Sequence, residues 1–166
     1  VNGARQAVTE SNRDVMVIAQ VTVETTGTML LGSEIGAALN ALEPLNIDLI
    51  GLNCATGPAE MSEHLRYLSK NSTCAISVMP NAGLPILGAK GAEYPLGPEE
   101  LAAALETFVN DYGISLIGGC CGTTPEHLAA VVNRLDRHAI KVRKPELDPG
   151  ASSLYQYVPF RQDKTY

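Results

Sequence analysis

Most of the chain alternates between two kinds of segment, which differ in how their apolar and polar residues are spaced. Short runs rich in apolar and β-branched residues, bounded by small or polar residues, predict buried strands. Between them, apolar residues recur at spacings of three and four, which predicts helices. The predicted strands cover residues 15–23, 47–54, 74–79 and 114–119, and the helices cover residues 1–11 or begin near residues 33, 58, 98 and 125.

The alternation of strands and helices predicts an α/β fold, because successive strands joined through helices form a parallel sheet with right-handed crossovers. Such a sheet is either open, with helices on both faces, or an arc of a (β/α)₈ barrel. Ser33 is the expected N-cap of the second helix. In the last helix, the residues expected to face inward are Leu128, Val131, Val132 and Leu135.

The pattern changes near Lys141, after which apolar residues follow no sustained period. We therefore expect one domain over residues 1–142 and a linker or wrapping tail over 143–166, with an unstructured tail as the alternative. Apolar side chains of this tail could dock on a neighbouring surface: Leu154, Tyr155, Tyr157, Val158 and Phe160.

Composition narrows the class of protein. Of 166 residues, 45% are apolar and 18% charged, which predicts a folded globular domain and excludes disorder as the main state. The net charge of −6 and the lack of a Lys/Arg cluster argue against a nucleic acid partner. No apolar run reaches the roughly 20 residues of a membrane span, and no leader segment is recognisable. We expect a cytoplasmic protein without a membrane partner.

Each predicted strand ends in a cluster of small and polar residues. These clusters lie at residues 24–27, 53–58, 80–85 and 118–125. The carboxyl ends of parallel strands share one edge of the sheet, so chemistry is expected at that edge in either architecture.

Cysteines lie at the carboxyl ends of two of these strands: Cys54 at the end of the second, and Cys120 and Cys121 directly after the fourth. Soft thiolates select zinc, and three sulfurs with one open position describe a catalytic rather than a structural zinc site. Adjacent residues of a strand point to opposite faces, so the two neighbouring cysteines need a turn to share a metal. Glycines that permit such a turn flank them at positions 118, 119 and 122. A redox pair, a vicinal disulfide and inert thiols are the alternatives.

The remaining cysteine and the histidines have more ordinary interpretations. Cys74 begins its strand, at the opposite edge, and is expected in the core. His64 and His127 lie within predicted helices and are expected to be surface or packing residues, although a structural site of three cysteines and one histidine is an alternative. His138 has no partner suggested by its position.

Three thiolates around a zinc ion would leave a net charge of −1. Such a site is a poor Lewis acid for water, but it can take up a further thiol and hold it as thiolate near neutral pH. The chemistry expected of this site is alkyl transfer to a substrate thiol.

The motifs Gly51–Cys54, Pro80–Gly83 and Gly118–Pro125, in this order, resemble those of the homocysteine S-methyltransferase family. Within it, they are most similar to the homocysteine-binding domain of cobalamin-dependent methionine synthases. The resemblance implies that zinc is bound by Cys54, Cys120 and Cys121 and activates L-homocysteine. It also implies a substrate pocket to which Asn53, Asn81 and the backbone near Gly83 contribute.

The resemblance further implies a complete (β/α)₈ TIM barrel, of which this chain supplies the fifth to eighth strands, a half-barrel fragment. The missing half carries the acidic residue that holds the substrate ammonium group, and Glu24 is a weak substitute. Methylcobalamin donates the methyl group and methyltetrahydrofolate regenerates it, on modules that this sequence does not contain. Residues 152–155 and 158–163 resemble the segment that leads into the folate-binding domain.

Three other functions stay open from the sequence. A half-barrel alone is expected to be inactive, and its open strand edges could pair with the missing half or with a second copy. A thiol redox module is another possibility. Stand-alone methyltransferases that use betaine or S-methylmethionine are the third, but they have no need of the tail.

Overall fold

The computed structural model describes residues 1–89, 91–135, 141–146 and 148–161. Its centre is a four-stranded sheet in the order β1-β2-β3-β6, in which all neighbours are parallel. The predicted α/β fold with a parallel sheet is confirmed, although the strands are shorter than the apolar runs. The strands are β1 (Ile18–Val21), β2 (Leu49–Asn53), β3 (Ala75–Met79) and β6 (Leu116–Ile117).

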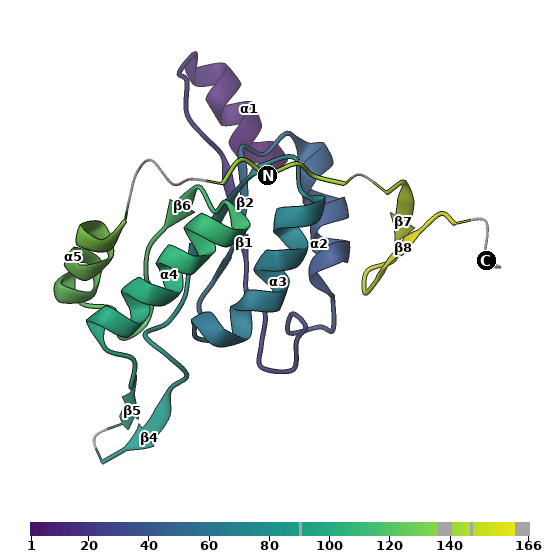
Figure 1. Cartoon of the computed structure of the whole chain (residues 1–166). Helices are drawn as coiled ribbons and strands as arrows, with labels where there is room; N and C mark the ends of the chain where they lie inside the picture. The colour runs from purple at the N-terminus through teal and green to yellow at the C-terminus, as the bar shows by residue number, and fades with distance from the viewer. Residues whose placement is uncertain (90, 136–140, 147, 162–166) are drawn as a thin grey trace.

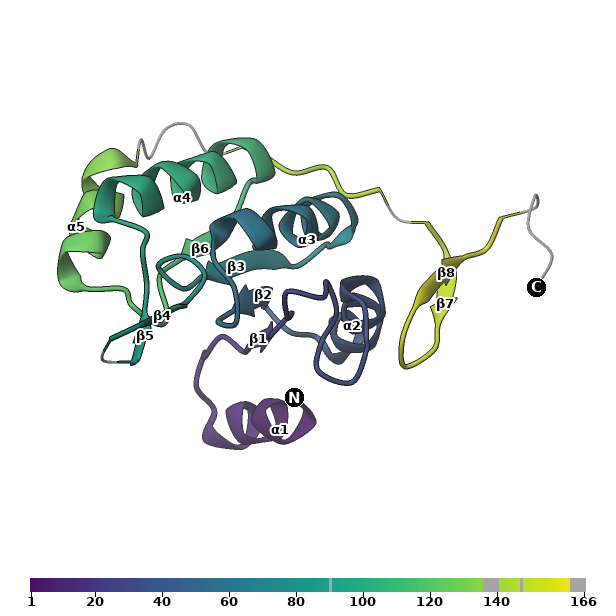
Figure 2. The same ribbon diagram turned by 90° about the horizontal axis from the view of Figure 1, so that it is seen from below.

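Helices connect the strands as the periodicity predicts. Figures 1 and 2 show α3 and α4 over one face of the sheet, and α1 on the far side of β1. Proline begins α3, α4 and α5, where its missing N–H leaves no hydrogen bond unmade. The helices are α1 (Asn2–Ser11), α2 (Ile35–Leu42), the 3₁₀ helix η1 (Glu43–Leu45), α3 (Pro58–Asn71), α4 (Pro98–Tyr112) and α5 (Pro125–Arg134).

The two faces of the sheet differ in polarity. Toward the helices, Ile50, Leu52 and Val78 are fully buried, and burial of each contributes about 1.5–3 kcal/mol. The other face carries polar side chains that bond to one another across strands. Gln20 Nε2 donates to Ser77 Oγ at 3.2 Å, and Thr22 Oγ1 donates to Asn53 Oδ1 at 3.1 Å.

Two expectations about the helices are wrong. The N-cap of α2 is Glu34 rather than Ser33, because the backbone of Glu34 is extended and its carbonyl accepts the first helical hydrogen bond, from Ala38. Leu128 and Val132 are 43% and 63% exposed, because α5 packs mainly on α4 and buries only its other side.

The long loop after β3 contains a hairpin that the sequence did not predict. Its strands are β4 (Ile86–Gly88) and β5 (Gly91–Glu93), which are antiparallel. Leu87, the middle residue of β4, is 95% exposed. Three-residue strands are too short to show an alternating pattern, which explains why it was missed.

The described part of the tail lies against the domain, as in the wrapping alternative of the two that the sequence offered. It forms a second hairpin, β7 (Gly150–Ser152) and β8 (Tyr157–Pro159), that contacts α2. Asn40 Nδ2 donates to Ser152 Oγ at 2.7 Å. Of the apolar side chains expected to dock, Tyr155 lies near Gly32 and Tyr157 near Gly36. Leu154, Val158 and Phe160 are exposed.

Within the described residues, no helix has both the length and the apolar character needed to cross a membrane.

Candidate metal centre at the carboxyl edge of the sheet

Backbone hydrogen bonds join the ends of three strands at the carboxyl edge of the sheet. Cys54, directly after β2, donates its N–H to the carbonyl of Met79 at 3.0 Å. Cys120, after β6, donates to the carbonyl of Pro80 at 2.8 Å, and the carbonyl of Cys121 accepts from Ala82 at 2.9 Å. The loops that carry the cysteines are therefore fixed to one another by the backbone.

Sharp turns direct the three cysteine side chains to one place. Cys54 and Ala55 adopt left-handed backbone conformations, with φ of 56° and 58°. Such conformations cost roughly 1–2 kcal/mol for residues other than glycine and concentrate at functional sites. After the adjacent pair, Gly122 has φ of 78° and Thr123 N–H donates to the carbonyl of Cys120 at 3.1 Å. The predicted turn after the cysteine pair is confirmed.

The spacing of the three sulfurs fits a tetrahedral zinc ion. Cys54 Sγ lies 3.7 Å from Cys121 Sγ, which lies 3.9 Å from Cys120 Sγ. All three sulfurs are within 4.8 Å of one another. Zinc–sulfur bonds of about 2.3 Å at tetrahedral angles put neighbouring sulfurs about 3.8 Å apart. The cysteines are free, and their separations exceed the roughly 2.0 Å of a disulfide bond.

The thiols differ in acidity although they are neighbours. Burial, together with hydrogen bonds to Cys54 and Cys121, raises the pKa of Cys120 to about 11. Hydrogen bonds from Tyr94, Cys54 and Cys120 lower the pKa of Cys121. The proton of Cys120 must therefore be displaced for this thiol to act as a ligand.

Tyr94 is a site residue that the sequence analysis missed. It lies between the β4–β5 hairpin and α4, and its proximity to Cys121 raises the pKa of Tyr94 and lowers that of Cys121. A Cβ atom at Gly122 would lie 2.3 Å from the Cβ of Tyr94, so glycine is required at that position. No sequence pattern identifies a tyrosine in a long loop as a site residue. Only its proximity to the cysteines in the folded structure does so.

The histidines and the fourth cysteine lie outside the cluster. Among the described residues that could hold a metal, the sulfurs of Cys54, Cys120 and Cys121 form the group. His127 is buried and bonds to Thr124 and to the carbonyl of Leu96, as expected of a packing histidine. His64 is half-buried on α3, and this burial lowers its pKa. Cys74 packs against the core, as predicted, and His138 lies outside the described residues.

The residues expected to contact substrate lie beside the cysteines. Asn81 is buried, and its Oδ1 accepts the N–H of Cys121 at 3.1 Å. Asn53 ends β2 next to Cys54 and accepts from Thr22. The N–H of Gly83 donates to the carbonyl of Asn81 at 2.8 Å.

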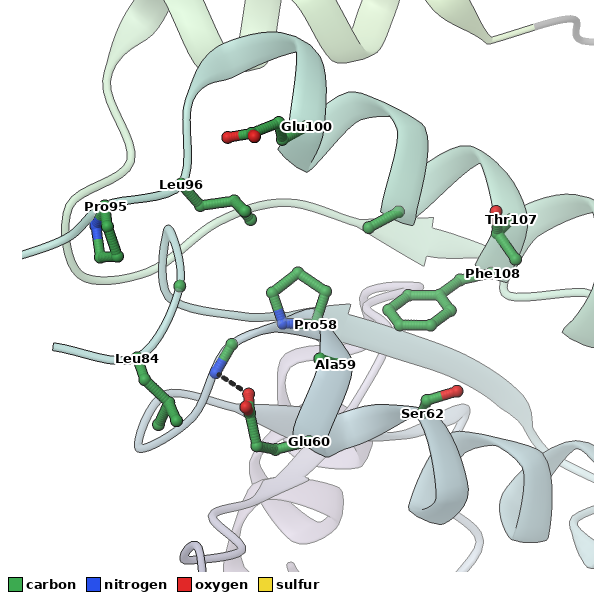
Figure 3. Close-up of a pocket in the computed structure, with 13 residues that line it drawn as sticks. Pro58, Ala59, Glu60, Ser62, Leu84, Pro95, Leu96, Glu100, Thr107 and Phe108 are labelled. Atoms are coloured by element: carbon green, nitrogen blue, oxygen red, sulfur yellow. Dashed lines mark hydrogen bonds between the residues drawn. The ribbon is translucent and has the colours of Figure 1, made fainter.

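A cavity of about 460 Å³ lies between the first turns of α3 and α4. Figure 3 shows Pro58, Leu96 and Phe108 around it, with Glu60 bonded to a backbone N–H. Its lining includes Gly83 but none of the three clustered cysteines. The cavity is therefore separate from the sulfur cluster.

Comparison with known proteins agrees with this geometry. The sequence model of the homocysteine S-methyltransferase family matches residues 1–135. Methionine synthase of Mycobacterium tuberculosis is 61% identical over 163 residues, which are 98% of this chain and 14% of that protein. Methionine synthase of Mycobacterium leprae is likewise 61% identical over 167 residues, with the same coverage. The chain thus spans about one seventh of these curated relatives (14%). It belongs to the homocysteine S-methyltransferase family.

Proposed function

We propose that the intact protein transfers a methyl group from methylcobalamin to L-homocysteine, giving methionine, and that Cys54, Cys120 and Cys121 hold the zinc ion of this site. The observation that carries the proposal is the sulfur spacing, 3.7 and 3.9 Å, at the carboxyl edge of a parallel sheet. Relatives named methionine synthase and the family match support the choice of substrate. Zinc, when bound, supplies an open position at which a substrate thiol is held as thiolate near neutral pH.

The chain's own residues would hold and orient the reactants. The fixed turns after β2 and β6 point three sulfurs at one position, so no ligand has to move to meet a metal. Asn53 and Asn81 engage their amide oxygens within the protein, which leaves their NH₂ groups as candidate donors to the substrate carboxylate. The backbone near Gly83 is a further candidate. No side-chain acid or base of this chain is required once the substrate is bound as thiolate.

We further propose that residues 1–142 are strands five to eight of a (β/α)₈ barrel and that residues 143–166 lead to a following domain. Within the described residues, the sheet has two open edges, at β1 and β6. Exposed apolar side chains lie at both ends: Met16 and Ile18 near β1, and Leu128 and Val132 on α5. Closing a barrel would cover these surfaces with neighbouring strands and helices. Methyltetrahydrofolate and methylcobalamin would then bind on other modules of the protein.

The open edges also favour a second candidate function, in which the half-barrel acts as a separate chain. A half-barrel would associate with the missing half or with a second copy, and would be inactive by itself. Size-exclusion chromatography distinguishes these cases, because a stable folded monomer would argue against obligatory association. In either case the thiols must stay reduced, which favours a cytoplasmic location.

The test uses the intact protein, with zinc measured by metal analysis and methyl transfer measured from methylcobalamin to homocysteine. We expect Cys121→Ala to lose both bound zinc and turnover. Undiminished zinc and turnover in this variant would contradict the proposal.

A further inference from the structure

The tail hairpin β7–β8 lies against α2 and reaches the loop that precedes this helix. Figures 1 and 2 show the hairpin beside α2. At the turn of the hairpin, the carbonyl of Tyr155 accepts the N–H of Glu34 at 2.8 Å, and Gln156 Nε2 donates to Glu34 Oε1 at 3.1 Å. The ring of Tyr155 lies 3.6 Å from the point where a side chain at Gly32 would begin. The turn is therefore joined to the end of the β1–α2 loop (residues 24–34) through both backbone and side chains.

Local hydrogen bonds fix the shape of this turn. Ser153 Oγ accepts the N–H groups of Tyr155 and Gln156 at 3.0 and 3.1 Å, and the N–H of Ser153 donates to the carbonyl of Gln156 at 3.0 Å. A serine hydroxyl that bonds to the backbone two residues on stabilises a turn. Nearby, Asn40 Nδ2 attaches β7 to α2 through Ser152 Oγ. The carbonyl of Tyr155 is therefore presented to the β1–α2 loop in one orientation.

Backbone hydrogen bonds continue this attachment through the β1–α2 loop to the end of β1. Met29 donates its N–H to the carbonyl of Ser33 at 2.8 Å, and Glu24 donates its N–H to the carbonyl of Thr28 at 2.9 Å. Ser33, which is buried, directly precedes Glu34. Each bonded pair begins where the previous one ends in the sequence, so the bonds lead from the tail contact to the first residue of the loop.

The loop follows directly on a residue that contacts the candidate substrate pocket. Thr22 lies two residues before Glu24 and donates its hydroxyl to Asn53 Oδ1 at 3.1 Å. Val23, between Thr22 and Glu24, is buried in the core. Because the Thr22 hydroxyl bonds to the amide oxygen of Asn53, its position decides where the NH₂ group of Asn53 points.

We propose that the tail hairpin is a clamp that positions the β1–α2 loop and, through Thr22, the side chain of Asn53 for homocysteine binding. This inference rests on the proposed function, in which Asn53 is a candidate donor to the substrate carboxylate. Substitutions along a bonded network can change binding severalfold even where the substituted residue contacts no ligand. Tyr155 is then a positioning residue, and the tail contributes to the substrate site as well as leading to a following domain.

The main experiment replaces Tyr155 in the intact protein. Tyr155→Ala removes the ring that packs on Gly32, so we expect faster hydrogen–deuterium exchange of the amides in residues 24–34. The KM for homocysteine should rise about fivefold with kcat nearly unchanged, as when binding common to substrate and transition state is lost. Tyr155→Phe keeps the ring and should restore both properties. Unchanged exchange or an unchanged KM in Tyr155→Ala would overturn the proposal.

The matched control is Leu154→Ala, one residue earlier in the same turn. Leu154 is 65% exposed, and its replacement leaves the ring of Tyr155 on Gly32. This variant should change neither the exchange nor the KM. An effect as large as that of Tyr155→Ala would overturn the proposal, because it would reflect loosening of the hairpin in general.

A double-mutant cycle tests the route through Thr22. Thr22→Val deletes the hydroxyl that bonds to Asn53 and should itself raise the KM for homocysteine. Adding Tyr155→Ala should then raise the KM no further, because the clamp has no bond left through which to act. Additive effects of the two substitutions would overturn the proposal.

Metal analysis separates this inference from the proposed function. Tyr155→Ala should keep its zinc, and loss of zinc would overturn the proposal, because the effect would then lie at the metal ligands. If Tyr155→Ala does not fold, Gln156→Ala removes only the side-chain bond to Glu34 and should raise exchange and KM about twofold. No change in that variant would likewise overturn the clamp. Retention of zinc and turnover in Cys121→Ala would contradict the proposed function instead.

Discussion

The two edges of the sheet both carry cysteines, but in opposite chemical surroundings. At the amino edge, the Cys74 thiol donates to the carbonyl of Ile47 at 3.3 Å. The carboxylate of Glu43 accepts the N–H groups of Thr73 and Cys74 at 2.6 and 3.2 Å, and also bonds to Ser72. Burial and the nearby Glu43 raise the pKa of Cys74, so this thiol stays neutral.

At the carboxyl edge, by contrast, the thiols face one another. Cys54 and Cys120 each lie within 4 Å of the Cys121 sulfur, at 3.7 and 3.9 Å. The backbone there is left-handed at Cys54, and the pKa of Cys121 is lowered. The strand end therefore decides the surroundings of a cysteine: hydrogen bonds at the amino edge stabilise the fold, while the carboxyl edge brings three thiols together.

The largest expected effect is on zinc content, when a cysteine at one edge or the other is replaced by alanine. Cys54→Ala should abolish stoichiometric zinc binding, because two sulfurs remain of a three-sulfur site. Cys74→Ala should leave the zinc content unchanged, since its thiol is bonded to a carbonyl at the other edge. Metal analysis of both purified variants provides the measurement, and equal loss in both would remove the distinction between the edges.

Zinc affinity should depend on pH at the carboxyl edge. The pKa of Cys120 is raised to about 11, so at neutral pH its proton must leave when a metal binds. Each proton released lowers the apparent affinity about tenfold for every unit by which pH falls. Competition with a chelator between about pH 6 and about pH 8 measures this dependence. An affinity that does not change with pH would contradict the coupling.

A smaller effect is expected at the amino edge, on stability. Glu43→Gln should lower the free energy of unfolding by about 2 kcal/mol, because a charged acceptor shared by several donors is replaced by a neutral one. The control is Glu63→Gln, on the exposed side of α3, which should change stability by less than about 0.5 kcal/mol. Urea unfolding measures both, and zinc content should not change in either.

The same carboxylate predicts the smallest effect, a pH dependence of stability. Partial burial would raise the pKa of Glu43, but hydrogen bonds from Thr73, Cys74 and Ser72 bring it below its usual 4.5. A lowered pKa stabilises the folded state above the pH at which the unfolded residue titrates. The advantage of the native protein over Glu43→Gln should therefore shrink as pH falls below about 4.5. An advantage that grows in acid would contradict this sign.

The sequence predicted the sheet and the cysteine cluster because both follow from local rules. Strand and helix positions came from periodicity, and parallel pairing placed Cys54 beside Cys120 and Cys121 despite their separation in the chain. Glycine after the pair allowed the turn that the cluster required, with φ of 78° at Gly122.

Other features depend on tertiary contacts, which the local sequence pattern does not predict. Tyr94 lies in a loop, and its place beside the cysteine turn arises from packing on Gly122. Leu128 and Val132 follow the period of a buried face but are exposed, because packing rather than period decides which side of α5 is covered. Glu34 rather than Ser33 is the N-cap of α2, and its N–H donates to the carbonyl of the distant Tyr155.

The most direct test of the proposed zinc site is X-ray absorption spectroscopy at the zinc edge of the intact protein, with and without homocysteine. Three cysteine ligands and one open position predict three sulfurs around zinc in the free protein and four when homocysteine is bound. A sulfur count that does not change on adding saturating homocysteine, or fewer than three sulfurs in the free protein, would contradict the central claim.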